Sequence, residues 1–230
     1  MKLNSPMILL AMLLILSGLG TCSGIQENEE KSKKSKVEPR FGKYNGLMSD
    51  SAMVVSAHPA ASDIGVDILR RGGNAADAAV AVQFALAVCF PYAGNIGGGG
   101  LLVYRPANGE SNALDFREKA PLAAHRDMYL DEKGEVIPNL SVFGRLSAGV
   151  PGSVAGMFEL HQRYGQLPWA DLIQPAIDLA RKGFAATAHE SKWLNDQKAD
   201  FERYNKGGQA YLVRAEPWQA GDTLRQEDLA

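Results

Sequence analysis

The residues best suited to chemistry are Asp115, Arg117 and Glu118, in the run Asp-Phe-Arg-Glu at the end of a short β-prone segment. If this run continues a strand, Asp115 and Arg117 point to the same face, because strand side chains alternate. A carboxylate beside the guanidinium could then hold it in place while its planar fork binds a planar anion through two hydrogen bonds. The competing interpretation is an ordinary surface ion pair, which contributes little to stability.

The sequence gives weaker support to a phosphate-binding glycine loop and to a serine nucleophile. The glycine-rich run 94–100 contains neither G-x-G-x-x-G nor G-x-x-x-x-G-K, and it follows an expected helix and precedes an expected strand. We therefore interpret its glycines as meeting a need for close backbone approach or positive φ rather than as a phosphate site. Ser147 and Ser153 do not lie in G-x-S-x-G, and no histidine is designated as a partner.

Composition argues against metal and nucleic-acid binding. The four histidines are scattered, and Cys22 and Cys89 are the only cysteines, so no spacing typical of a zinc site occurs. The chain has 24 Lys and Arg against 26 Asp and Glu, for a formal net charge of -2, which disfavours a nucleic-acid partner. We expect no metal ligands, and Cys89 is interpreted as a small buried hydrophobe.

The N-terminus is typical of an exported protein. A positive start at Met1-Lys2, an apolar run at 7–16 and small residues after it predict a signal peptide over 1–22. The run before Cys22 resembles a bacterial lipoprotein processing site, so Cys22 is a candidate for lipidation. A membrane-spanning anchor ranks second, because the apolar run is shorter than the roughly 20 residues needed. Residues 23–45 are charge-rich and predict a flexible tether. The expected location is the periplasm, with membrane attachment only through a lipid.

The body, residues 46–230, predicts a mixed α and β fold. The short β-prone run at 53–57 suggests a first strand, and 101–104 with 112–116 suggest a hairpin. Helices are expected after Pro59, after Asn74 with Asp77 in the first turn, after Pro151-Gly152 and after Pro168. The helix after Asn74 is apolar on all sides and is therefore expected to be buried.

Five segments, in order, resemble one known family: Ser56 to Gly73, 74–79, 93–100, 115–121 and 149–156. They are similar to the N-terminal part of the large subunit of bacterial γ-glutamyltranspeptidases, also called glutathione hydrolases. The resemblance covers about residues 45–230, and five ordered motifs are far more specific than one.

The resemblance implies an N-terminal nucleophile hydrolase with an αββα sandwich, an α+β fold only partly represented in this chain. Such enzymes are made as precursors that cut themselves into a large and a small subunit, the latter beginning with a catalytic threonine. Its hydroxyl attacks the γ-glutamyl amide of glutathione or a related compound, with its own α-amino group as base. The acyl group then passes to water or to an amino acid or peptide acceptor. No cofactor is implied.

The resemblance also assigns residue roles. The arginine matching Arg117 binds the α-carboxylate of the γ-glutamyl group. From their positions beside it, we expect Asp115 and Glu118 to support this site. Thr21, Thr187 and Thr223 are the only threonines, and none has the paired-threonine context of the family's processing site. We therefore expect no catalytic nucleophile within these residues and no activity from this chain alone. Two alternatives stay open, a related acylase or amidohydrolase on the same scaffold and a catalytically inactive surface lipoprotein that binds a partner.

Overall fold

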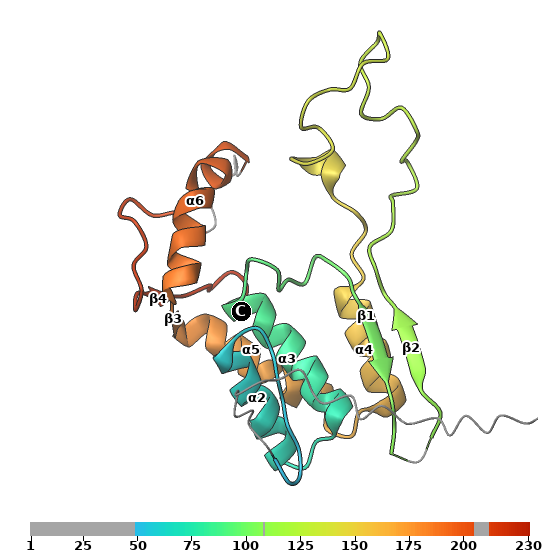
Figure 1. Ribbon diagram of the computed structural model, residues 1–230, viewed down its shortest axis with the longest axis vertical. Helices are drawn as coiled ribbons and strands as arrows, with labels where there is room; N and C mark the ends of the chain where they lie inside the picture. Colours follow the sequence, from blue (N-terminus) through green and yellow to red (C-terminus); the bar gives the residue numbers. More distant parts are fainter. Residues whose placement is uncertain (1–48, 108, 205–211) are drawn as a thin grey trace, which may run out of the picture. The chain divides into compact units, whose positions relative to one another are not determined.

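A single buried helix organises the fold. The computed structural model describes residues 49–107, 109–204 and 212–230, and its helix α3 (Ala75–Cys89) packs against α2 (Pro59–Arg70), α4 (Ser153–Tyr164) and α5 (Trp169–Lys182) (Figure 1). Small side chains let neighbouring helices approach α3 closely, and its alanines 76, 81 and 85 are almost fully buried. The prediction of a helix buried on all sides is confirmed, and Cys89 at its end has no exposed surface.

The N-terminus of α3 is tied to a distant turn. The Asn74 side chain accepts hydrogen bonds from the amides of Ala76 and Asp77, and the Asp77 carboxylate accepts one from the Asn74 amide at 2.9 Å. This reciprocal pair is the capping box expected from Asn74 and Asp77. Asp77 also accepts from the Gln166 amide at 3.0 Å, and Asn74 donates to the Tyr164 carbonyl. The same two residues therefore cap α3 and hold the connection between α4 and α5.

The predicted hairpin is present. Strand β1 (Leu101–Tyr104) pairs antiparallel with β2 (Asn112–Asp115), in a register that places Leu101 opposite Asp115. Leu102 and Tyr104 face the core formed by α3 and α4, whereas Leu101 and Val103 on the other face are 69% and 78% exposed. The hairpin therefore has one packed face and one apolar face that no described residue covers.

A long excursion separates β2 from α4. Lys119 and Val150 form an antiparallel bridge through two backbone hydrogen bonds of 3.1 and 2.8 Å. Between them the chain follows turns, a second bridge at Leu130 and Val136, and the 3-10 helix η1 (Arg145–Ser147). The Lys119–Val150 bridge thus closes the base of this arm immediately after the Asp-Phe-Arg-Glu run.

The expected strand at 53–57 is not observed. Exposure does alternate along this segment, with Val54 half-buried and Met53 and Val55 exposed. Val54 packs toward Gly65 of α2. The residues are β-prone, but a strand also needs a hydrogen-bonded neighbour, and no described residue supplies one.

The C-terminal elements were not predicted. They are strand β3 (Phe184–Ala185), helix α6 (Ala188–Tyr204) and strand β4 (Thr223–Leu224), which pairs antiparallel with β3. The start of α6 did carry a signal, because Thr187 and Glu190 form a capping box in which the Thr187 amide donates to the Glu190 carboxylate at 2.7 Å. The two-residue strands depend on partners about 40 residues apart and leave no periodic pattern.

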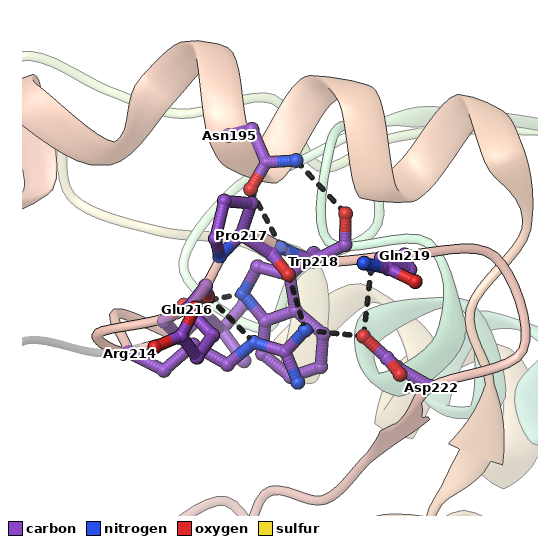
Figure 2. A network of polar contacts seen from close by, with 8 residues as sticks. Asn195, Arg214, Glu216, Pro217, Trp218, Gln219 and Asp222 are labelled. Atoms are coloured by element: carbon purple, nitrogen blue, oxygen red, sulfur yellow. Dashed lines mark hydrogen bonds and ion pairs between the residues drawn. The ribbon is translucent and has the colours of Figure 1, made fainter.

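A polar network fastens the segment before β4 to α6 (Figure 2). The Asn195 side chain bonds both the amide and the carbonyl of Trp218, at 2.8 and 2.9 Å. The Arg214 guanidinium lies 4.0 Å from the centre of the Trp218 ring and pairs with Asp222. These contacts satisfy the polar groups of a segment that has little regular structure of its own.

Several expectations fall outside what the structure describes. The predicted signal peptide at 1–22, with Cys22, and the tether at 23–45 lie outside the described residues. Within the described part, no helix is both long and apolar enough to span a bilayer. Helices and small sheets interleave, as expected for an α+β fold.

The Asp77 contacts lead to a stability prediction. Asp77→Ala should lower the free energy of unfolding by about 2 kcal/mol, because it removes a buried carboxylate that accepts hydrogen bonds from the partly buried amides of Asn74 and Gln166. The control is Asp63→Ala, an exposed position on α2, which should change it by less than about 0.5 kcal/mol. Urea unfolding of the full chain measures both, and equal losses in the two variants would contradict the anchoring role.

Candidate functional site

The site is centred on Arg117, which lies just beyond the end of β2. Strand pairing stops at Asp115, so Arg117 is not the next strand residue on the Asp115 face. The Asp115 carboxylate instead accepts a hydrogen bond from the Arg117 backbone amide at 3.0 Å. The expectation that Asp115 holds the guanidinium is therefore wrong. It holds the backbone, because the chain turns at this point and brings the amide, not the side chain, toward the carboxylate.

Glu118 makes the contact expected of Asp115. Arg117 Nε donates to Glu118 Oε2 at 3.3 Å, and the two side chains are 65% and 38% exposed. The pKa of the Glu118 carboxyl lies below its ordinary value, chiefly because its own backbone N–H stabilises the ionised form. The Arg117 guanidinium and the Gly99 amide act in the same direction, against an opposing effect of partial burial. Glu118 is therefore a carboxylate that orients Arg117.

One edge of the guanidinium is available to a ligand. Glu118 occupies Nε, and among the described residues no acceptor bonds Nη1 or Nη2 of Arg117. Those two nitrogens present parallel N–H groups in the geometry that a carboxylate binds bidentately. The backbone of Arg117 is thus anchored, while Nη1 and Nη2 of its guanidinium remain available to bind an anion.

The other candidates serve structure. Ser147 Oγ donates to the Gly144 carbonyl at 2.7 Å, and Ser153 is buried in the first turn of α4. Within residues 94–100 no glycine has positive φ, whereas a Cβ on Gly94 would overlap the Leu86 carbonyl. Close approach is therefore the reason for glycine at Gly94. Across the described part of the chain, no three His, Cys, Asp or Glu side chains gather in a way that could hold a metal ion.

A second buried polar cluster joins α2 to α6, and sequence reasoning missed it. His58 caps α2 by accepting from the Ala60 amide through Nδ1, and its Nε2 lies 3.3 Å from Glu190 Oε1. The Nε2 atom is at ion-pair distance from Glu190 without hydrogen-bond geometry.

Burial, together with the Glu190 charge, raises the pKa of the Cys89 thiol to about 12, so this thiol is protonated and unreactive.

The two described threonines have structural positions. Thr187 Oγ1 accepts from the Glu190 amide at the start of α6, and Thr223 lies in β4. Neither hydroxyl lies beside a free amino group, and Thr21 lies outside the described residues. Nothing in these positions resembles an activated nucleophile.

The chain was compared with known proteins. The family model described as gamma-glutamyltranspeptidase matches residues 61–230. The chain is 48% identical over 183 residues to the glutathione hydrolase proenzyme of Pseudomonas sp. strain A14, covering 79% of this chain and 32% of that protein. It is 41% identical over 184 residues to the acylase ACY 1 proenzyme of Pseudomonas sp. strain V22, covering 77% and 33%.

The structure is similar to the crystal structure of Helicobacter pylori gamma-glutamyltranspeptidase, with a TM-score of 0.76 and 47% identity over 80% of this chain and 53% of that one. The expected fold, that of the N-terminal nucleophile hydrolases, agrees with this neighbour. The chain spans about a third of the length of the curated relatives it matches.

The Arg117–Glu118 contact makes an electrostatic prediction. Arg117→Met should raise the pKa of Glu118 toward its ordinary value of 4.5, because the ionised carboxylate loses a favourable cation. The rise should be partial, since the backbone N–H groups stay in place. Carboxyl NMR titration of the full chain measures it, with Arg126→Met as an exposed control. An unchanged Glu118 pKa in the Arg117 variant would show that the pair does not form in solution.

Proposed function

Because the chain belongs to the γ-glutamyltranspeptidase family, we propose that it forms the N-terminal part of the large subunit of an exported γ-glutamyltransferase, a glutathione hydrolase made as a precursor. The observation that carries the proposal is the anchored guanidinium of Arg117 with its free edge. A γ-glutamyl donor carries an α-carboxylate away from the bond to be broken, which is the planar anion such an edge binds.

Each residue of the run has its own task in this proposal. Arg117 binds the donor's α-carboxylate through Nη1 and Nη2, and Glu118 holds the guanidinium plane from the Nε side. Asp115 fixes the backbone from which the side chain extends. Binding energy at this remote carboxylate orients the γ-amide, which lies at the other end of the glutamyl chain.

The nucleophile in this proposal comes from the small subunit of the same precursor. An N-terminal threonine there attacks the γ-carbonyl, its α-amino group takes the hydroxyl proton, and the amine of the donor leaves. The γ-glutamyl ester that results is then attacked by water or by an amino acid or peptide. No metal ion or organic cofactor takes part in these steps.

Exposed apolar surface supports a second subunit as partner. Val55, Leu101 and Val103 are 83%, 69% and 78% exposed in the described structure. Val55 lies outside the strands of the described structure, whereas Leu101 and Val103 form one face of β1. An apolar strand face of this kind is normally covered by another layer of a domain. In the proposed enzyme, the small subunit of the same precursor supplies that layer.

An acylase acting on other amides is the second candidate, and the similarity to the acylase ACY 1 proenzyme favours it. Both candidates use the same scaffold, so the distinction lies in the acyl group. Comparing kcat/KM for γ-glutamyl anilides and for acyl anilides without an α-carboxylate separates them. An enzyme that depends on Arg117 as proposed prefers the γ-glutamyl donors.

The proposed location is the periplasm, with attachment through a lipid on Cys22. Cys22→Ser should move the protein from the detergent phase to the aqueous phase in a Triton X-114 partition, because the acyl chains supply the membrane affinity. The measurement is an immunoblot of both phases from the producing bacterium. Recovery of the unaltered protein in the aqueous phase would contradict lipidation.

Arg117 is tested in the complete precursor. Arg117→Lys should raise the KM for a γ-glutamyl anilide about 10-fold to 100-fold, with a smaller effect on kcat, because lysine keeps the charge and loses the two-pronged geometry. Arg126→Lys, an exposed arginine on the arm, is the matched control. An unchanged KM in the Arg117 variant removes the carboxylate-binding role.

The 230-residue chain alone serves as the inactive reference, and glutamate release by it would place the nucleophile within these residues.

A further inference from the structure

We propose that Gly99, Gly152 and Gly156 are positioning residues for the substrate carboxylate, because together they form the wall that fixes Phe116, Arg117 and Glu118. This inference rests on the proposed function, and it assigns a role to glycines that do not contact the substrate. They come from three separate parts of the chain, namely the loop before β1, the segment after the arm and helix α4.

Gly152 stands behind the backbone of Phe116. A Cβ on Gly152 would overlap the Phe116 carbonyl oxygen, a backbone atom that cannot move aside without moving Arg117. The approach is secured by hydrogen bonds, because the amides of Gly152 and Ser153 both donate to the Gly98 carbonyl, at 2.7 and 2.9 Å. Only hydrogen at this position permits the observed packing.

Gly99 contacts the next part of the same run. Its Cβ would lie 2.5 Å from the Phe116 carbonyl oxygen and 2.8 Å from both Arg117 Cα and the Glu118 nitrogen. Real Cβ atoms do not approach other atoms this closely. Any side chain at Gly99 would therefore push the Arg117 backbone outward.

Gly156 receives the Phe116 ring on the surface of α4. A Cβ there would overlap Phe116 Cγ and lie 2.6 Å from Cδ2. Phe116 packs into the core shared by α3 and α4, and its amide donates to the Gly100 carbonyl at 3.0 Å. The residue before Arg117 is thereby anchored in the core.

The consequence is that the exposed Arg117 guanidinium extends from a tightly packed backbone. The Arg117 side chain is 65% exposed and is contacted by Glu118, which also lies at the surface, so packing of the side chain itself contributes little to its place. Its position depends mainly on the backbone, which the glycine wall, the Asp115 contact and the Lys119–Val150 bridge hold. A displacement of about 1 Å at such a site is expected to cost up to 100-fold in rate.

The test measures how well the complete precursor discriminates a γ-glutamyl anilide from its α-methyl ester. Gly156→Ala should reduce this ratio of kcat/KM values about 10-fold, although alanine is the better helix former at a helix interior. The ratio does not depend on the fraction of active enzyme, so partial misfolding does not disturb it. Gly97→Ala is the matched control, because a Cβ there meets nothing within 4 Å.

Three further variants keep the test decisive. Gly100→Ala places a Cβ 2.9 Å from the tip of the Phe116 ring and should give a smaller loss if Gly156→Ala yields no active enzyme. Adding Phe116→Ala to Gly156→Ala should restore part of the discrimination, because the new Cβ clashes with the Phe116 ring that the second substitution removes. Adding Phe116→Ala to Gly152→Ala should restore none, because there the clash is with the Phe116 backbone.

The outcomes separate the two proposals. If the unaltered enzyme discriminates and both Gly156→Ala and Gly100→Ala keep the ratio, the positioning role is overturned while the function stands. Equal loss of kcat/KM for acid and ester donors shows a purely structural role and also overturns it. If the unaltered enzyme cleaves neither donor, the proposed function falls, and the inference falls with it.

Discussion

The burial of α3 on all sides is the constraint on which the described structure depends. Its small residues allow α2, α4 and α5 to surround it, and its first turn holds the connection between α4 and α5 through Asn74 and Asp77. Because α4 is fixed in this way, Gly156 is in place to receive Phe116. The loop that leaves the other end of α3 brings Gly99 against the backbone of the same run. The backbone of Arg117, the proposed substrate-binding residue, is thus positioned by packing that depends on α3.

At the candidate site the backbone is tightly packed, whereas the charged side chain is exposed. The backbone around Arg117 is held by close contacts and hydrogen bonds, whereas the guanidinium is exposed and no residue of the described structure bonds its Nη1 or Nη2. Glu118, ionised and adjacent, limits the orientations of the guanidinium without occupying its outer edge. Such an arrangement suits recognition of a small anion, because the cost of ordering the cation is met largely before the ligand arrives.

Local signals in the sequence predicted much of the fold. The capping residues Asn74 and Asp77, the helix starts after Pro151-Gly152 and Pro168 and the hairpin all have mechanisms that act within a few residues. Helix α6 was missed although Thr187 and Glu190 carried a capping signal. The segment 53–57 was predicted as a strand from its β-prone residues, but strand formation depends on a neighbour that the segment itself cannot supply.

The sequence alone determined the residue types of the site, the buried character of α3 and, through five ordered motifs, the family. These follow from local chemistry and pattern, which need no knowledge of distant contacts. Only the tertiary structure decided that Glu118 rather than Asp115 holds the guanidinium, and that Gly99, Gly152 and Gly156 meet around Phe116. Those facts depend on where the chain turns after β2 and on which segments converge there. Packing between residues far apart in the chain sets both.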